Sequence, residues 1–388
     1  MASSPRKILV VDDEPDLEHL LRRRLRRDVR DGRYELLFAR DGFEALELLK
    51  EDRDIELVLS DINMPGMTGL TLLEQIPQVD PHIRAVIVSA YDDMENIRTA
   101  MNRGAFDFIT KPINFGDLKI TIEKTLNHMQ QMREALEARD RLVTLQNELD
   151  IASRMQQSIL PRQFPSPPGY QMFGNMEPAR EVGGDFFDVT DLADGRVGLT
   201  VADVSGKGVP AALFMMLSRA LLKSAATLLP SPSEVLAAVN SALEADNAAA
   251  MFVTLFHAML DPQTGTLQYA NGGHNPPLII HANGSPSLLP TTDGLVLGVV
   301  PGFSYGQLSV ALEPGDIAIL YTDGVTEAVN EADEEFGLQR LEAVFADQRL
   351  AGAGAQDICN AIFDAVRRFA GERPQFDDIT CLVVMRDG

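Results

Sequence analysis

The chain has 388 residues, enough for two or three domains of ordinary size, and 45% of them are hydrophobic, enough for buried cores. Its formal net charge of −23 argues against a nonspecific nucleic-acid binder, because nucleic-acid phosphates would repel it. No apolar run approaches the roughly 20 residues that span a bilayer, and the N-terminus lacks a signal-peptide pattern. The two cysteines, Cys359 and Cys381, lie far from any metal-ligand cluster. These features predict a cytoplasmic protein.

The first third of the chain alternates short β-branched runs with amphipathic segments. Five runs are expected to form buried strands: residues 8–11, 36–39, 57–60, 85–89 and 106–110. Helical patterns lie between and after them: residues 17–27, 42–50, 70–75, 94–103 and from 117 onward. A β-α alternation repeated five times predicts a parallel sheet with helices on both faces.

Polar residues follow the ends of these predicted strands. Asp12 and Asp13 follow the first strand, Asp61 ends the third, Ser89 the fourth and Lys111 the fifth. Because the carboxyl ends of parallel strands meet at one edge of the sheet, we expect three acids, a hydroxyl and an ammonium to share one crevice.

This set of groups suits magnesium and phosphoryl transfer. Asp13, Asp61 and the backbone carbonyl of Asn63 can hold Mg²⁺, with Asp12 acting through a water molecule. The metal would neutralise an incoming phosphoryl group, and Asp61 would attack it as the nucleophile. The hydroxyl and the ammonium would then bind the phosphoryl oxygens.

This region resembles the response regulator receiver domain in the motifs LVVDDEP, LSDINMPGMTGL, VSA and FITKP. The resemblance implies a five-stranded flavodoxin-like fold that a histidine kinase phosphorylates, with Asp61 as the phosphoacceptor. Phe108 lies where the family's switch aromatic usually lies, two to three residues before the lysine. A plain core position is the alternative for Phe108.

The chain contains no glycine or proline from about residue 118 to residue 159. Two sets of residues follow a heptad spacing there: Leu118, Ile122, Thr125, Met129, Met132 and Leu136, then Leu142, Leu145, Leu149, Ala152, Gln156 and Ile159. The two phases do not join smoothly around Arg139. The pattern predicts one long helix or two stacked ones, pairing with a second copy of the chain. A helix packed on its own domain is the alternative.

The last part of the chain has short strands and glycine-punctuated turns around three helical segments. These segments are residues 210–229, 233–245 and 356–370. The pattern predicts an α/β sandwich with much antiparallel sheet.

Four acidic motifs lie beside apolar runs of this last region. Asp203 and Asp323 each follow such a run, Asp377 and Asp378 precede one, and Asp185 follows a pair of glycines. Carboxylates beside a buried sheet are costly, and metal binding is the usual resolution. A site of oxygen ligands alone favours Mg²⁺ or Mn²⁺ over zinc. Two such metals about 4 Å apart can orient a phosphoryl group without a covalent nucleophile.

These motifs resemble the SpoIIE/RsbU-type family of PPM metal-dependent protein phosphatases, from about residue 151 to the C-terminus. Seven motifs carry the resemblance: ASRMQQSILP, REVGGDFFDV, VADVSGKGVPAALFM, ANGGHNPP, GLVLGVV, LYTDGVTEAVN and FDDITCLVV. The resemblance implies catalytic metal binding by Asp185, Asp203, Asp323, Asp377 and the Val204 carbonyl. Asp378 is the alternative to Asp377. The implied substrate is phosphoserine or phosphothreonine, often of an anti-sigma-factor antagonist.

We therefore expect a receiver domain at residues 1–120, a helical coiled-coil linker at 121–160 and a phosphatase domain at 161–388. The expected function is a phosphorylation-controlled protein phosphatase with a histidine kinase or other phosphodonor as its partner. The alternative is an RssB-like non-enzymatic adaptor that binds a sigma factor or its regulator, and the loss of metal-binding acids would favour it. All four positions are acidic here, which favours an enzyme. A DNA-binding response regulator is disfavoured because the output region is acidic and lacks a basic helix.

Overall fold

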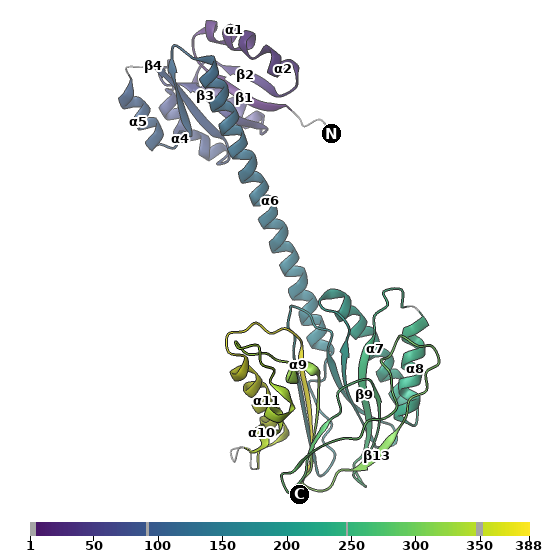
Figure 1. The fold of residues 1–388 in the computed structure, drawn as a ribbon. Helices are drawn as coiled ribbons and strands as arrows, with labels where there is room; N and C mark the ends of the chain where they lie inside the picture. Colours follow the sequence, from purple (N-terminus) through teal and green to yellow (C-terminus); the bar gives the residue numbers. More distant parts are fainter. Residues whose placement is uncertain (1–4, 91–92, 246, 347–351) are drawn as a thin grey trace. The chain divides into compact units, whose positions relative to one another are not determined.

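The computed structural model describes residues 5–90, 93–245, 247–346 and 352–388. The chain forms two compact units, Met1–Thr144 and Leu145–Gly388. One helix, α6 (Phe115–Ile159), runs from the first unit into the second (Figure 1).

The first unit is built on a parallel sheet with strand order β2-β1-β3-β4-β5. Its strands are β1 (Arg6–Val11), β2 (Tyr34–Ala39), β3 (Ile55–Asp61), β4 (Arg84–Ala90) and β5 (Asp107–Lys111). The helices before α6 are α1 (Pro15–Arg24), α2 (Arg26–Arg30), α3 (Gly42–Glu51), α4 (Gly69–Val79) and α5 (Met94–Asn102). This strand order is that of flavodoxin-like folds, so the predicted fold class is confirmed for this unit.

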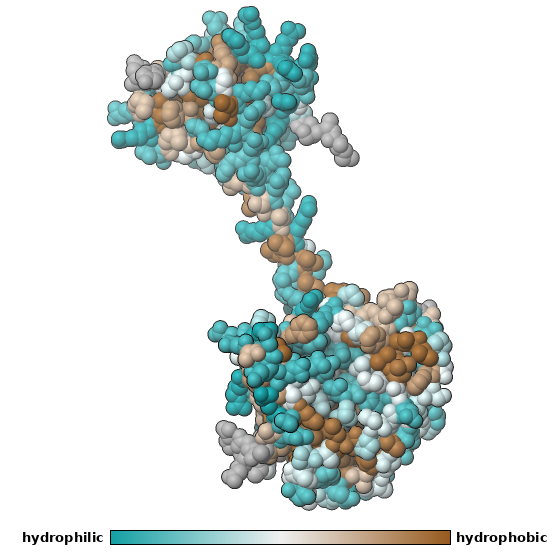
Figure 2. All heavy atoms as spheres, viewed as in Figure 1, coloured by the Kyte–Doolittle hydropathy of each residue, from teal (hydrophilic) through white to brown (hydrophobic). Residues whose placement is uncertain are grey.

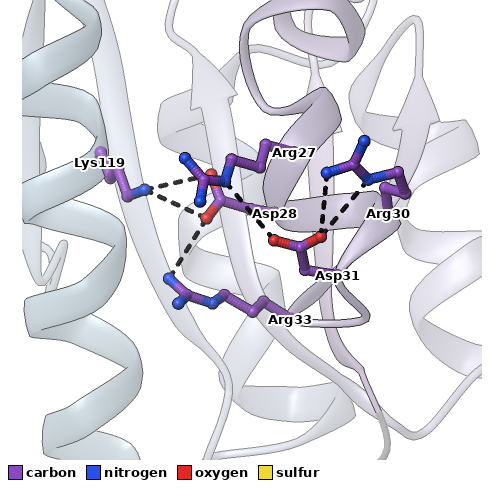
Figure 3. A network of polar contacts seen from close by, with 6 residues as sticks. All are labelled: Arg27, Asp28, Arg30, Asp31, Arg33 and Lys119. Atoms are coloured by element: carbon purple, nitrogen blue, oxygen red, sulfur yellow. Dashed lines mark hydrogen bonds and ion pairs between the residues drawn. The ribbon is translucent and has the colours of Figure 1, made fainter.

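The first turns of α6 belong to the core of the first unit. Leu118, Ile122, Leu126 and Met129 are buried against strand residues such as Leu57. At the surface, Lys119 donates hydrogen bonds of 3.1 and 3.2 Å to the buried carboxylate of Asp28 in α2, which also faces Arg33 (Figure 3).

The predicted linker helix is therefore continuous. Its first heptad residues, however, pack into the core of the first unit instead of forming the expected coiled-coil seam. The apolar residues up to Met129 are covered by the first unit's own sheet, which removes their surface from water without a second copy of the chain. The apolar residues farther along are not covered, with Leu142 67% and Leu145 53% exposed, and Figure 2 shows apolar side chains on this part of α6.

The second unit is a sandwich of two antiparallel five-stranded sheets. The first sheet has the order β13-β10-β9-β8-β7, formed by β7 (Phe186–Asp191), β8 (Val197–Val204), β9 (Val253–Asp261), β10 (Thr266–Gly272) and β13 (Leu308–Ala311). The second has the order β12-β11-β14-β15-β6, formed by β6 (Tyr170–Glu177), β11 (Leu278–Ile280), β12 (Pro286–Leu288), β14 (Ile317–Tyr321) and β15 (Ile379–Arg386). Side chains from both sheets, including Leu199 and Leu382, share one core. The predicted sandwich is confirmed.

Helices cover the outer faces of the two sheets. The first sheet packs against α7 (Val209–Leu228) and α8 (Pro232–Ala245), and the second packs against α11 (Ala355–Ala370). Shorter helical segments precede α11: α9 (Asp323–Thr326), α10 (Gly337–Ala343) and a 3₁₀ turn at Val344–Ala346. Cys359 of α11 and Cys381 of β15 are both buried free thiols, as expected of core residues.

One described helix, α7, has the length and apolar composition of a membrane span. Polar residues such as Arg219 and Lys223 interrupt the helix, so its sequence contains no continuous apolar run of that length. Its inner face, with Ala211, Met215 and Leu222, is buried in the core of the sandwich. A core helix of a folded domain meets the same criterion of length and composition.

Candidate functional site

The structure brings the predicted acids of the first unit together. Asp12 and Asp13 follow β1, and Asp61 is the last residue of the neighbouring strand β3. Each of these three residues offers a carboxylate oxygen within 4.8 Å of the other two. Hard divalent cations prefer such oxygen clusters, so the residues present fit Mg²⁺.

Lys111, at the end of β5, is the cation of this cluster. Its Nζ lies 2.7 Å from Asp61 Oδ2 and 3.0 Å from Asp12 Oδ2. Burial alone would lower the pKa of Lys111, but the hydrogen bonds and charges of Asp61 and Asp12 outweigh it and raise the pKa above its usual value. The ammonium is therefore charged at every physiological pH, as a ligand for phosphoryl oxygens must be.

The other predicted residues of this site lie nearby but make different contacts. The Asn63 amide lies 3.4 Å from Asp61 Oδ1, which leaves the Asn63 carbonyl available as a ligand. The buried Ser89 hydroxyl donates to Asp93 at 3.2 Å rather than to the acid cluster. Phe108 in β5 is 38% exposed, so the alternative of a plain core position does not hold.

A glycine allows α4 to start against strand β3. A Cβ on Gly69 would lie 2.0 Å from the backbone oxygen of Asp61. The Gly69 amide donates to the carbonyl of Ile62 at 2.9 Å. Gly69 is therefore required for the close approach that sets the backbone around Asp61.

In the second unit, the four predicted acids come from four strand ends in two sheets. Asp185 directly precedes β7 and Asp203 is the second-last residue of β8, both in the first sheet. Asp323 begins α9 just after β14, and Asp377 lies two residues before β15, both in the second sheet. The site thus lies where one end of each sheet meets the other.

Burial and mutual repulsion hold these carboxyls away from their usual titration range. Burial, and then the charges of Asp203 and Asp378, raise the pKa of Asp185 well above its ordinary value. Burial and the charge of Asp323 raise the pKa of Asp203 to about 7. Burial and then Asp377 also raise the pKa of Asp323. Within the described ranges these acids are spaced more widely than the cluster of the first unit. Carboxylates that repel one another are suited to a divalent cation, because the charge of the cation offsets their repulsion.

The structure distinguishes the adjacent Asp377 and Asp378. The Asp378 carboxylate is buried and accepts backbone amides from Ala179 at 2.7 Å and from Gly184 at 2.6 Å. Asp377 instead has a partly exposed carboxylate with Oδ2 3.0 Å from Lys207 Nζ. Asp378 thus holds the loop before Asp185, whereas the Asp377 carboxylate accepts from the Asp378 amide at 2.9 Å and faces the Lys207 ammonium.

Lys207 and Thr380 are site residues that the sequence interpretation did not single out. The Lys207 ammonium lies 3.7 Å from the centroid of the Phe376 ring, beside Asp377. The Thr380 hydroxyl donates to Asp185 Oδ2 at 2.7 Å and so orients this carboxylate. Both residues lie inside the acidic motifs VADVSGKG and FDDITC, so their position within a motif was the available signal.

His274 is buried next to the acids, and its ring nitrogens pair with other residues rather than with the carboxylates. Its Nε2 lies 3.1 Å from the Tyr321 carbonyl and its Nδ1 lies 2.8 Å from the Thr254 hydroxyl. Burial lowers the pKa of His274 to about 4. A neutral, fully paired imidazole steadies the end of β14, from which Asp323 follows.

Asp203→Asn is expected to stabilise the metal-free protein at neutral pH. Because the pKa of Asp203 is raised from 3.8 to about 7, its contribution to stability is full below about pH 4 and is lost as pH rises to about 7. Three pKa units correspond to at most about 4 kcal/mol. Thermal unfolding in EDTA at about pH 5 and about pH 8 would measure the loss. The exposed Asp191→Asn is the control, and a wild-type pH slope in Asp203→Asn would contradict the assignment.

Two family models match the chain. The response regulator receiver domain matches residues 8–123, and Stage II sporulation protein E (SpoIIE) matches residues 193–387, half of the chain. Asp203, Asp323 and Asp377 lie inside the second match, and Asp185 lies just before it.

Two curated relatives extend these matches. Protein IcfG of Synechocystis is 33% identical over 267 residues, which are 62% of this chain and 42% of IcfG. Phosphoserine phosphatase RsbU of Bacillus subtilis is 28% identical over 274 residues, which are 70% of this chain and 80% of RsbU. The chain thus spans less than half the length of IcfG but most of RsbU.

A solved structure of a phosphatase domain is also similar to the chain. The SiaA-PP2C domain of Pseudomonas aeruginosa is 27% identical with a TM-score of 0.57, and the match covers 64% of this chain and 99% of that domain. The chain belongs to the SpoIIE family, and it joins a response regulator receiver domain to a PP2C-type phosphatase domain.

Proposed function

We propose that the chain is a response regulator that removes phosphate from serine or threonine of a partner protein. The observation that carries the proposal is the convergence of Asp185, Asp203, Asp323 and Asp377 from two sheets beside Lys207. A cavity of about 300 Å³ includes one of these acids, Asp377, in its lining, together with Gly324 and Phe376, and offers room for substrate.

In the phosphatase domain, the four aspartates and the Val204 carbonyl would hold two Mn²⁺ or Mg²⁺ ions. When bound, these ions supply charge neutralisation and Lewis-acid activation of water. The chain's own groups orient the site: Thr380 holds the Asp185 carboxylate, and Asp378 holds the loop before it. Lys207 bears the positive charge beside Asp377, where it would attract the substrate's phosphate.

In the receiver domain, Asp61 would accept the phosphoryl group from a histidine kinase or another phosphodonor. Asp13, Asp61 and the Asn63 carbonyl would hold Mg²⁺, with Asp12 acting through water. Lys111 already lies within hydrogen-bond distance of Asp61. Ser89 and Phe108 would form the switch, which requires the Ser89 hydroxyl to leave Asp93 for the phosphoryl oxygens.

The proposed substrate is an anti-sigma-factor antagonist in the cytoplasm. RsbU bears the name phosphoserine phosphatase, which supports phosphoserine as the target. An RssB-like adaptor, the alternative, would not need the acids at strand ends that this chain retains. The test is hydrolysis of phosphoserine on candidate antagonists from the same cell, with Mn²⁺, with and without acetyl phosphate. Binding without turnover in every condition would favour the adaptor.

We propose that the linker, residues 121–160, pairs two copies of the chain through its part beyond Met129 and passes the receiver's state to the phosphatase domain. The support is the uncovered apolar side chains of Leu142 and Leu145. Helix pairing would bury such a stripe. A phase break near Arg139 allows two packings of similar energy, which a switch requires.

Inserting two or three residues near Arg139 is expected to abolish the dependence of activity on phosphodonor. The insertion rotates the apolar stripe out of register, whereas deleting the full heptad 142–148 keeps the register and serves as the control. Coupling of this kind is typically about 5- to 150-fold. Activity and dimer mass would be measured with and without acetyl phosphate. If the out-of-register insertion leaves regulation intact, the linker is only a tether.

A further inference from the structure

The last turns of α6 form hydrogen bonds with the loop before Asp185 through one side chain, Gln156. This side chain is only 2% exposed, although its neighbours Met155 and Gln157 are exposed. Its Nε2 donates to the Gly183 carbonyl at 2.6 Å, and its Oε1 accepts from the Gly183 amide at 3.0 Å. Among the hydrogen bonds of the described residues, these two alone link this end of α6 to another segment.

The loop segment that Gln156 holds leads directly to Asp185. Gly184 follows Gly183, and its amide donates to Asp378 at 2.6 Å, while the Asp185 carboxylate meets the Thr380 hydroxyl at 2.7 Å. A Cβ on Gly183 would lie 2.4 Å from Asp378 Oδ2. The turn before Asp185 is thus held tightly between the α6 amide and the Asp378 carboxylate.

The chemistry of this contact requires a primary amide. Gln156 offers one donor and one acceptor to the two backbone groups of the same residue, so neither buried backbone group is left unpaired. A methionine would fill the same space but would leave both groups of Gly183 unpaired. An ionised glutamate could still accept from the Gly183 amide but could not donate to its carbonyl, so the glutamate variant is tested at about pH 8.

We propose that Gln156 is a positioning residue that sets the metal affinity of the phosphatase site by fixing the turn that bears Asp185. The inference rests on the proposed function, because it assigns metal binding to Asp185. Groups that orient metal ligands typically contribute 10- to 100-fold in metal affinity.

The test compares Gln156→Met with Gln157→Met in the full chain. Gln157 is the adjacent exposed glutamine, so the control makes the same chemical change without loss of the contact. Mn²⁺ binding is measured by titration calorimetry, with the receiver's Asp13→Asn and Asp61→Asn changes in every chain so that only the phosphatase site reports. Gln156→Met is expected to raise the Mn²⁺ dissociation constant about 10- to 100-fold. Gln157→Met should bind like the parent chain.

Two further measurements separate positioning from a general structural role. Hydrolysis of a small aryl phosphate by Gln156→Met should recover towards the parent kcat at saturating Mn²⁺, because the ligands themselves are intact. The Mn²⁺ affinity of Gln156→Glu should lie between those of the parent chain and Gln156→Met. This variant provides the test if Gln156→Met fails to fold. Parent-like Mn²⁺ affinity in whichever variant folds would overturn the proposal. A Gln156-dependent Mn²⁺ affinity in a parent chain that hydrolyses no phosphoester would uphold this inference and refute the proposed function.

Discussion

Asp203→Asn and Asp323→Asn are each expected to reduce phosphatase activity at least about a hundredfold. The change keeps the shape of the side chain but removes one negative charge from the set that would hold two divalent ions. Such losses remove several kcal/mol of transition-state stabilisation, and each 1.36 kcal/mol is about tenfold in rate. Turnover of a phosphoserine protein with Mn²⁺, and the same assay in excess EDTA, measure the effect.

The exposed Asp191 provides the control for both variants. Asp191 ends β7 within the same sheet as Asp203, and its replacement by asparagine removes the same charge at a distance from the site. It should retain the activity of the parent chain. Parent-like rates in Asp203→Asn and Asp323→Asn, or full turnover in EDTA, would refute the two-metal site. Because Asp203→Asn should also stabilise the metal-free protein, its lost activity cannot be attributed to unfolding.

Asp61→Ala is expected to abolish phosphorylation of the receiver domain completely. Asp61 Oδ2 is the carboxylate oxygen nearest to Lys111 in this cluster, at 2.7 Å against 3.0 Å for Asp12 Oδ2. The intact mass after incubation with acetyl phosphate and Mg²⁺ measures the gain of one acid-stable, base-labile phosphate. The exposed Asp54→Ala, in the loop before β3, should be phosphorylated like the parent chain. A phosphate gained by Asp61→Ala would show that another residue is the acceptor.

The receiver fold was predictable because its strands and helices are encoded in short stretches of the sequence. Each strand is a short apolar run, and parallel strands necessarily bring their carboxyl ends to one edge, so Asp12, Asp61 and Lys111 could be grouped from their positions along the chain. The role of the first α6 heptads was not predictable in this way. A heptad pattern indicates only that one face of the helix is apolar, and it does not indicate what covers that face. Here the sheet of the same unit covers it up to Met129.

The acids of the phosphatase domain were likewise only partly predictable from the sequence. An acid beside a buried apolar run is detectable in the sequence because its burial without a partner would be costly, and this identified Asp203 and Asp323. The choice between Asp377 and Asp378 was left open because both precede the same strand. Neighbouring side chains of an extended segment point in opposite directions, so only their surroundings distinguish them. Asp378 meets backbone amides, and Asp377 meets Lys207.

The sequence by itself determined the two folds, the helical character of the segment between them and the acids at the strand ends, because strand periodicity, helix periodicity and the cost of a buried charge all act over short stretches of chain. Only the tertiary structure showed that this segment is one continuous helix. Only the tertiary structure decided which contact Gln156 makes. In the sequence it occupies a heptad position beside Ile159, as a seam residue would. In the fold, its amide meets Gly183, 27 residues away, because hydrogen-bond partners are set by which surfaces pack together and not by the spacing along one helix.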